Sequence, residues 1–290
     1  KIMNKEKISV IVTLYNRLEY ARNMILSLIN QTLMIDELIF ADDGSKEDVA
    51  DVIKDLIAKC PFEIKCVYQE DIGFRLARSR NNGARTATGE LLIFLDQDVI
   101  MPDDFIEKIY NARKKKRIVF SRGVLSYERQ KEKIQMDLNQ GKNFSKIYKF
   151  VTSRQKSEIK KFVKRDILYR VLYKLKLRTR GAKIVGLIFS LYREDYVAIN
   201  GFDENYIGWG HEDDDFGNRF FKYGGETYSF KFERYPIHMY HKSASPKDGS
   251  VNENYYRKRK KEICKSNYKC EYGFGNRKDK DEVKLKYIKK

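Results

Sequence analysis

Two acidic clusters contain the residues whose types and spacing could do chemistry. The run from Gly208 to His211 includes the only tryptophan of the chain, Trp209, and four consecutive acidic residues, Glu212 to Asp215, follow it. Asp96-Gln97-Asp98 comes directly after Leu91 to Leu95, an apolar run that predicts a buried strand. Adjacent carboxylates repel one another unless a cation or a reaction uses them. The two clusters together predict an active site with a metal ion and a carboxylate base.

The three histidines of the chain add possible metal ligands. His211 directly precedes the cluster from Glu212 to Asp215, and His238 and His241 belong to a predicted strand from Tyr235 to His241. Carboxylate and imidazole groups can bind Mg²⁺ or Mn²⁺, so Asp98 with one of the two later histidines could hold such an ion beside a pyrophosphate. A carboxylate on the opposite side could deprotonate an attacking hydroxyl group. Group transfer from a nucleotide-activated donor to an alcohol needs both.

Alternating strand and helix signals must position these residues. Apolar runs at 8–14, 38–41, 64–68 and 91–95 alternate with helical spacing at 18–33, 49–57 and 76–87. This order predicts an α/β fold with a mostly parallel central sheet flanked by helices. Asp42 to Ser45 and Asp96 to Asp98 then fall at the carboxyl ends of strands, where open α/β sheets bind their ligands.

The net charge of +18 is concentrated in two segments. Residues 121–180 carry +13 and residues 257–290 carry +9, so the rest of the chain is slightly acidic. Apolar residues recur every four positions from Ile159 to Leu175, with basic residues on the other faces, which predicts a basic amphipathic helix. Such a helix either packs on the core with a solvated basic face or binds an anionic membrane surface. No nucleic-acid-binding motif accompanies the charge, so we expect no nucleic-acid partner.

The cysteines and the hydropathy limit the compartment. The four cysteines include no Cys-x-x-Cys pair and no histidines at zinc-site spacing, which indicates reduced thiols and no structural zinc. No run approaches the roughly 20 apolar residues needed to span a bilayer. We therefore expect a cytoplasmic protein, with peripheral attachment to the inner face of the cytoplasmic membrane through residues 121–180 and the C-terminal segment as a further expectation.

Five motifs in order resemble those of family 2 glycosyltransferases with the GT-A fold. They are Ile8 to Arg17, Asp42 to Ser45, Ala77 to Gly83, Asp96 to Asp98 and Gly208 to Phe216. The Trp-Gly-x-Glu-Asp-x-Asp form, followed by Tyr240-His241, is especially similar to bacterial chondroitin polymerase transferase domains and to β-1,4-galactosyltransferases. The resemblance runs from about Ile8 to His241, with the insertion after Ser121 outside it. Leu14 departs from the pattern, and His211 replaces the commoner glycine.

The resemblance implies a role for each matching position. The nucleotide-sugar residues would be Thr13, Tyr15, Asp43, Arg75, Arg80, Asp96 and Gln97. Asp98 and His241, rather than His238, would hold Mn²⁺ or Mg²⁺. Asp213 would be the general base, with Glu212 and Asp214 as neighbours that orient sugar hydroxyls. Trp209, Gly210 and Asp214 would bind the acceptor.

The implied function is an inverting, metal-dependent transfer from a UDP-sugar to a hydroxyl group of a glycan or lipid-linked glycan. A hexose or an N-acetylhexosamine would be transferred, in the synthesis of a bacterial capsule or lipopolysaccharide. The expected parts are a nucleotide-sugar-binding half (1–120), a basic helical insertion (121–180), an acceptor-binding and catalytic half (181–250) and a basic C-terminal tail (251–290).

Two other classes of protein remain open from the residues. A metal-dependent nucleotidyltransferase would share the sheet and the cation but would not need the acidic motif after Trp209. A non-enzymatic protein that binds membranes or nucleic acid would explain the two basic segments and nothing else. The donor sugar also stays open among UDP-GalNAc, UDP-Gal, UDP-GlcNAc and UDP-GlcA, because a few contacts in a pocket decide such selectivity.

Overall fold

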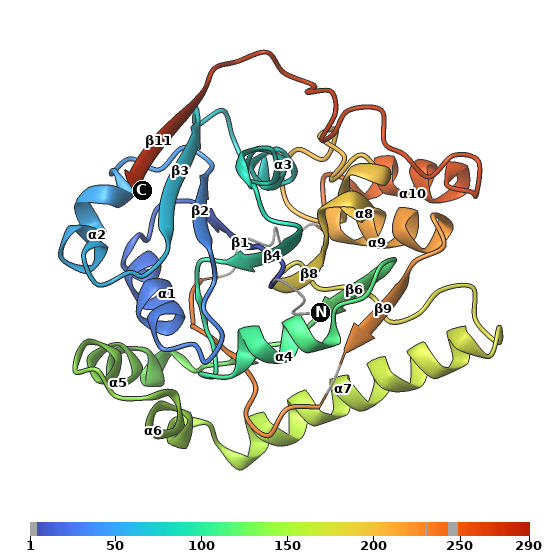
Figure 1. The fold of residues 1–290 in the computed structure, drawn as a ribbon. Helices are drawn as coiled ribbons and strands as arrows, with labels where there is room; N and C mark the ends of the chain where they lie inside the picture. Colours follow the sequence, from blue (N-terminus) through green and yellow to red (C-terminus); the bar gives the residue numbers. More distant parts are fainter. Residues whose placement is uncertain (1–4, 230, 243–248) are drawn as a thin grey trace.

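An eight-stranded sheet forms the centre of the molecule in the computed structural model, which describes residues 5–229, 231–242 and 249–290 (Figure 1). Its strand order is β11-β3-β2-β1-β4-β8-β6-β9. The strands are β1 (Ile8–Leu14), β2 (Glu37–Asp42), β3 (Glu63–Gln69), β4 (Leu91–Asp96), β6 (Arg117–Phe120), β8 (Ile188–Tyr192), β9 (Glu226–Ser229) and β11 (Val283–Lys289). The pairs β3-β2, β2-β1, β1-β4 and β6-β9 are parallel, and the other three are antiparallel. The predicted α/β fold with a mostly parallel sheet is confirmed.

The first half of the chain forms the elements that the periodicity predicts. The helices α1 (Glu19–Ile29), α2 (Val49–Ile57) and α3 (Leu76–Thr86) connect the first four strands. In the register, Thr13 lies opposite Asp96 and Leu14 lies opposite Asp42. The ends of β1, β2 and β4 are therefore level at one edge of the sheet, and their acidic turns are neighbours there.

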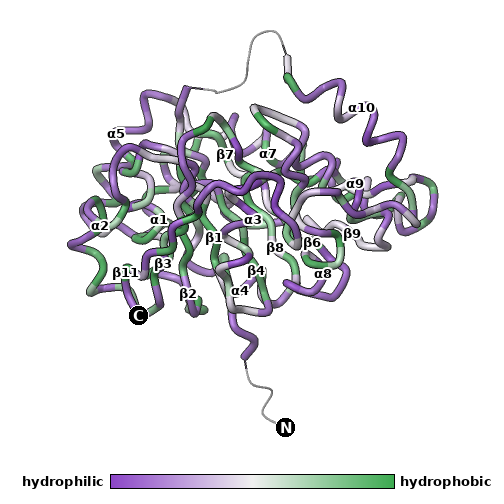
Figure 2. Tube along the Cα trace, turned by 90° about the horizontal axis from the view of Figure 1, so that it is seen from above, coloured by the Kyte–Doolittle hydropathy of each residue, from purple (hydrophilic) through white to green (hydrophobic). Residues whose placement is uncertain are grey.

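Helices cover both faces of the sheet because its strands are apolar on both sides. Ile8, Val10 and Val12 of β1 pack on the side of α1, α2 and α4 (Phe105–Ala112). Ile11 points to the other side, toward α3, α8 (Arg193–Ala198) and α9 (Glu212–Lys222) (Figure 1). Figure 2, a view from above, shows hydrophobic residues along the central strands and a mostly hydrophilic α10 (Glu253–Glu262) at the periphery.

The basic segment 121–180 is largely helical, as expected. It contains α5 (Glu128–Asn139), α6 (Phe144–Ile147), the 3-10 turn η1 (Tyr148–Phe150) and α7 (Ser153–Lys174). It also supplies a short strand, β7 (Val124–Leu125), to a second sheet of order β5-β10-β7, in which β5 is Val99–Ile100 and β10 is Ile237–His238. The chain that enters this segment is therefore joined to the strand that carries His238.

The predicted apolar stripe of α7 does not stay on one face. Ile159 and Val163 are buried, whereas Val171 is 43% and Leu175 is 62% exposed. Four residues turn an α-helix through about 400°, so each step along the stripe rotates it by about 40°. The stripe starts against the core and ends in solvent, which corrects the expectation of a helix with a single apolar face.

The last 40 residues are part of the fold, although their charge led us to treat them as a tail. α10 lies beside α9, where the His211 and Tyr256 rings stack with centroids 4.5 Å apart. β11 pairs with β3 in antiparallel fashion and forms the outer edge of the large sheet. Within the described chain, no helix combines the length and the apolar character needed to cross a membrane.

Candidate active site

A cleft of about 530 Å³ opens at the carboxyl ends of β1, β2 and β4. The first turn of α9 and the end of β10 form its other wall. It is lined by every site residue that the sequence predicted except Arg75, namely Thr13, Tyr15, Asp43, Arg80, Asp96, Gln97, Asp98, Trp209, Gly210, Glu212, Asp213, Asp214 and His241. Segments separated by more than 200 positions therefore meet in one site.

The turn after β1 is fixed by the Asp96-Gln97-Asp98 motif. The Tyr15 amide donates to Gln97 Oε1 at 3.0 Å, and Gln97 Nε2 donates to the Asn16 carbonyl at 3.1 Å. The Thr13 hydroxyl donates to Asp96 Oδ1 at 3.1 Å. The buried Gln97 amide thus holds the backbone that presents Tyr15, whose side chain is exposed at the mouth of the cleft.

Asp43 is the buried carboxylate that follows β2. Its oxygens accept from Gln69 Nε2 at 2.5 Å and from the Arg75 amide at 2.8 Å. Burial raises the pKa of Asp43 to about 6 against the effect of these hydrogen bonds. Asp43 therefore carries less charge near neutral pH than an exposed aspartate.

The Arg75 side chain does not lie in the cleft, contrary to our expectation for a nucleotide-binding residue. Its guanidinium donates to the Glu70 carbonyl at 2.6 Å and pairs with Asp281 at 3.2 Å. Only its backbone amide serves the site, by holding Asp43. The reason is the C-terminal strand: the segment before β11 brings Asp281 to the start of α3, which the local sequence could not indicate.

Arg80 joins the two acidic clusters from the buried side. It is 1% exposed, and its guanidinium lies 3.3 Å from Asp96 and 3.2 Å from Glu212. Helix α3 can approach the sheet this closely because Gly83 has no side chain: a Cβ there would lie 2.4 Å from Ile11 Cγ2. Arg80 thereby balances the two carboxylates and fixes the distance between them.

Asp98, His238 and His241 form a group that could hold a metal ion. One potential ligand atom from each lies within 4.8 Å of the others. His241 Nε2 is 3.0 Å from Asp98 Oδ2, and His238 Nε2 is 3.4 Å from Asp98 Oδ1. The sequence had favoured His241 over His238, but the pairing of β10 with β5 and β7 brings both imidazoles to Asp98.

The donor set fits a divalent cation. Asp98 Oδ1 is buried and accepts no hydrogen bond from the described residues, so one carboxylate oxygen is left without a donor. His241 Nδ1 donates to the Lys242 carbonyl at 2.9 Å, which leaves the lone pair of Nε2 directed at Asp98. The nearby imidazoles of His238 and His241 hold the pKa of Asp98 well below its usual range. A carboxylate with two imidazoles offers Mn²⁺ or Mg²⁺ mixed oxygen and nitrogen ligands.

The four consecutive carboxylates of α9 point in different directions because each residue turns the helix by about 100°. Glu212 faces Arg80, Asp214 accepts from Lys183 Nζ at 2.7 Å, and the fully buried Asp215 accepts from Arg219 Nε at 2.6 Å. Asp213 faces the cleft, and the described residues give it a single hydrogen bond, a 3.3 Å contact from the Gly186 amide. Among the described residues, no cation forms an ion pair with Asp213.

Burial raises the pKa values of Glu212 and Asp213. Repulsion from Asp213 adds to the rise at Glu212, and repulsion from Asp214 adds to that at Asp213. Lys183 and Arg80 oppose the rise at Asp213 through their positive charges. A carboxylate in this environment is a stronger base than an exposed aspartate, which suits proton abstraction from a hydroxyl group.

Left-handed backbone shapes the turn before α9. His211 has φ +74°, between Gly208 and Gly210 at φ +83° and +100° on one side and the helix on the other. Glycine adopts this conformation without strain, whereas histidine does so at a cost. The His211 imidazole lies 2.7 Å from a Glu253 carboxylate oxygen. The histidine thus ties the turn to α10, and Trp209 is left 40% exposed at the cleft.

Lys183 is a cleft residue that the sequence reasoning missed. It lies in the segment before β8 and pairs with Asp214. The chain has 59 lysines and arginines, and nothing in the sequence around Lys183 separates it from the others. His238 had a usable signal, since it lies three residues before His241 in the same predicted strand.

Comparisons with known proteins agree with this geometry. The family model described as glycosyl transferase family 2 matches residues 9–173, and the model described as the N-terminal domain of galactosyltransferase matches residues 166–242. The first match extends through most of the basic segment, which we had placed outside the resemblance.

Three curated relatives show the range of similarity. Chondroitin synthase of Escherichia coli is 26% identical over 75% of this chain and 32% of its own length. Validoxylamine A glucosyltransferase of Streptomyces hygroscopicus is 35% identical over 36% of this chain and 25% of its own length. Cholesterol galactosyltransferase of Borreliella burgdorferi is 35% identical over 39% of this chain and 31% of its own length. The chain thus spans about a third or less of these relatives.

Among solved structures, S. aureus TarS 1-349 in complex with UDP is similar in fold. It superposes with a TM-score of 0.52 at 15% sequence identity, over 83% of this chain and 62% of that one. A second structure of S. aureus TarS gives a TM-score of 0.51 at 13% identity, over 81% of this chain and 37% of the other. At this identity the likeness concerns the fold alone.

Proposed function

This chain belongs to glycosyl transferase family 2, and from that premise and the geometry of the cleft we propose that it is a metal-dependent, inverting glycosyltransferase. It transfers a hexose or an N-acetylhexosamine from a UDP-sugar to a hydroxyl group of a glycan. The observation that supports this most is that one cleft contains the Asp98-His238-His241 group and the unpaired carboxylate of Asp213. Direct displacement at an anomeric carbon needs a stabilised leaving group and a base on the opposite side.

The donor end of the proposed site is the turn after β1 with the turn after β2. Tyr15 and Thr13 are open to the cleft beside Asp43, which makes them available to a nucleoside. The backbone there is held by Gln97, so the binding surface is formed before the donor arrives. Arg80 and Asp96 orient one another at the floor of the cleft; the Arg75 side chain takes no part in this proposal.

The leaving-group end is Asp98 with both histidines. Bound there, Mn²⁺ or Mg²⁺ would neutralise the charge that develops on the departing UDP. Asp98 contributes a carboxylate oxygen that no described residue satisfies, and His241 is oriented by the Lys242 carbonyl. The Met239 amide donates to the Asp98 carbonyl at 2.8 Å, which fixes the histidine segment against the aspartate.

The acceptor end is the first turn of α9. Asp213 accepts the proton of the attacking hydroxyl group, while Glu212 and Asp214 are each held by a cation and orient the sugar. The exposed Trp209 ring offers an apolar face to the acceptor sugar, and Gly210 keeps the backbone beside it open. Neutral Asp213 could not act as a base, so the reaction needs its ionised form.

The biological acceptor that we propose is a bacterial surface glycan, of a capsule or lipopolysaccharide, either free or linked to a lipid. The enzyme would then work in the cytoplasm at the inner face of the membrane. Attraction of the basic segments to anionic lipid is part of this proposal. The charge of residues 121–180 and of the C-terminal segment is consistent with it.

Substitution of Asp213 by asparagine tests the proposal. Release of UDP from a panel of UDP-sugars, measured with Mn²⁺ and an acceptor glycan, identifies the donor. With that donor, Asp213→Asn should lower kcat about 10²-fold to 10⁴-fold. UDP affinity, measured by calorimetry, should stay near that of the wild type because Asp213 lies at the acceptor end. Asp214→Asn is the matched control and should lose less.

Two results would contradict the proposal. Near-normal turnover by Asp213→Asn would exclude this residue as the base and direct attention to Glu212. Release of pyrophosphate instead of UDP would identify a nucleotidyltransferase, and the absence of any donor turnover would leave only a binding function.

A further inference from the structure

The outward face of the second half of α7 carries a patch of large apolar side chains. Leu168, Val171 and Leu175 are 52%, 43% and 62% exposed, and Leu177, just past the helix, is 70% exposed. With Leu172, the three helical residues fall within an arc of about 100° on the side opposite Ile159 and Val163. We call Leu168, Val171, Leu175 and Leu177 the apolar patch.

The apolar patch is distinct from the other exposed apolar side chains. Val197 and Leu125, for example, are single residues on separate elements, as is usual for a soluble protein. The patch instead groups four side chains within ten positions. Figure 1 shows α7 along the outer edge of the molecule, and no drawn element lies beyond the end of the helix that bears the patch. Contiguous exposed apolar surface of this kind indicates an interaction site.

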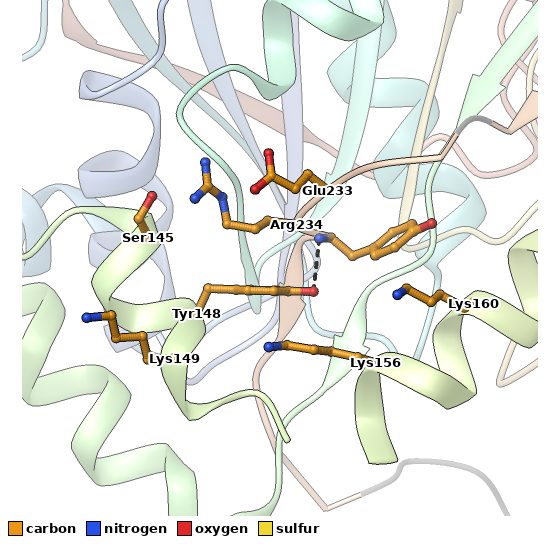
Figure 3. Close-up of a pocket in the computed structure, with 8 residues that line it drawn as sticks. Ser145, Tyr148, Lys149, Lys156, Lys160, Glu233 and Arg234 are labelled. Atoms are coloured by element: carbon orange, nitrogen blue, oxygen red, sulfur yellow. Dashed lines mark hydrogen bonds between the residues drawn. The ribbon is translucent and has the colours of Figure 1, made fainter. Parts of the chain in front are cut away.

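Cations without ion-pair partners surround the apolar patch. Lys161, Lys164, Arg165 and Lys176 are exposed, and none forms an ion pair with a described residue. The unpaired cations continue toward the start of α7, where a pocket of about 280 Å³ is lined by Lys149, Lys156, Lys160 and Arg234 with one carboxylate, Glu233. Figure 3 shows Lys156 and Lys160 projecting from α7 near Tyr148.

We propose that α7 lies on an anionic membrane surface, with the apolar patch at the headgroup boundary and the surrounding cations on lipid phosphates. A helix with an apolar strip flanked by lysine and arginine binds such an interface in its plane. Each basic residue near the surface adds to the attraction. A second copy of the chain is the less suitable occupant, because a two-fold contact through the patch would bring the same cations together.

The inner side of α7 gives this contact a consequence for the site. Asp166 and Tyr169 line a pocket of about 310 Å³ together with Lys183 and Asp213. A helix that rests on the membrane would therefore keep the base end of the cleft near the surface from which a lipid-linked acceptor arrives. This consequence rests on the proposed function; the membrane contact adds a named surface to the lipid attraction proposed there and is tested separately from catalysis.

Vesicle binding tests the contact without any sugar transfer. The full chain should sediment with vesicles of phosphatidylcholine containing phosphatidylglycerol and remain in solution with pure phosphatidylcholine. Leu168→Glu with Leu175→Glu should weaken binding by at least about tenfold, because it removes two leucines from the contact with lipid and adds two negative charges. Val197→Glu with Ile72→Glu adds the same charge at exposed apolar positions outside both basic segments and should bind as the wild type does. Thermal unfolding of both variants checks that they fold.

Two outcomes would overturn the proposal. Equal binding of the patch variant and the wild type would show that the apolar patch does not touch the membrane. A wild-type dimer in analytical ultracentrifugation that the patch variant abolishes, without binding to either vesicle, would assign the patch to a second copy of the chain. UDP release from the donor, measured with a water-soluble acceptor, should be equal in all variants, which separates this test from that of the proposed function.

Discussion

At the scale of residues, identical side chains have different tasks because of what faces them. The first turn of α9 presents three adjacent aspartates: one faces Lys183, one is buried with Arg219, and Asp213 is open to the cleft. The helix N-terminus favours their negative charge as a group. The direction of each side chain therefore leaves Asp213 as the aspartate without a cation, which is the residue that we propose as the base.

Lys183 should set the pH at which Asp213 becomes active. Its positive charge lowers the pKa of the buried aspartate, and the reaction needs the ionised form. In Lys183→Met the pKa of Asp213 should rise. Because only ionised Asp213 is active, lowering the pH should then abolish activity at a higher pH than in the wild type. The acid limb of kcat/KM against pH, measured at saturating Mn²⁺, should shift upward, even where the loss of the Lys183–Asp214 ion pair lowers the maximal value. An unshifted limb would contradict the assignment.

Both histidines of the metal group should be needed for affinity. His238→Ala removes a ligand from one side of Asp98, and the affinity for Mn²⁺, measured by calorimetry in the absence of any sugar, should fall at least about tenfold. His211→Gly is the matched control, because it removes the third imidazole of the chain and also relieves the positive φ. Equal loss of Mn²⁺ affinity in both variants would contradict the assignment of His238 as a metal ligand.

At the scale of elements, register and helix position bring the residues together. The pairing of β1 with β2 and β4 makes the acidic turns neighbours, and β10 adds the histidines through a second small sheet. α9 is anchored from below by an ion pair between Asp215 and Arg219, both fully buried. The orientation of Asp213 depends on this anchor.

Breaking the anchor of α9 should destabilise the protein. Asp215→Ala leaves the Arg219 guanidinium buried without its carboxylate, which costs about 3–5 kcal/mol of the free energy of unfolding. Asp215→Leu with Arg219→Leu should recover much of this loss, because no charge is left unpaired. Urea unfolding of both variants measures the difference, and a single variant as stable as the wild type would refute the role of the pair.

At the scale of the whole molecule, the end of the chain completes the first half of the fold. β11 covers the edge of β3, and Asp281 just before it lies 2.5 Å from Arg78 and 3.2 Å from Arg75. The C-terminal segment thereby turns Arg75 away from the cleft. Several basic residues of the C-terminal segment therefore belong to the strand β11.

Removal of β11 should lower stability without removing the site. A chain that ends at Asp281 keeps the partner of Arg75 and Arg78 but exposes the edge of β3, so its Tm should fall by at least about 5 °C and its tendency to aggregate should increase. Calorimetry and light scattering measure the two effects. Asp281→Ala in the full chain is the control, because it removes only the ion pairs and should leave β11 in place. An unchanged Tm of the truncated chain would contradict a structural role for β11.

The sequence by itself determined the α/β alternation, the approximate bounds of the first helices and strands, and the position of Asp42 to Ser45 and Asp96 to Asp98 at strand ends. These depend on periodicity within ten or fifteen residues, which the chain carries locally. The tertiary structure alone decided that Arg75 points away, that His238 joins His241, that Lys183 enters the cleft and that Asp213 is the unpaired carboxylate. Each of these depends on the packing of segments far apart in the sequence. The apolar stripe of α7 depends on both. The sequence predicts its spacing, but only the packing of α7 against the sheet shows where the stripe leaves the core.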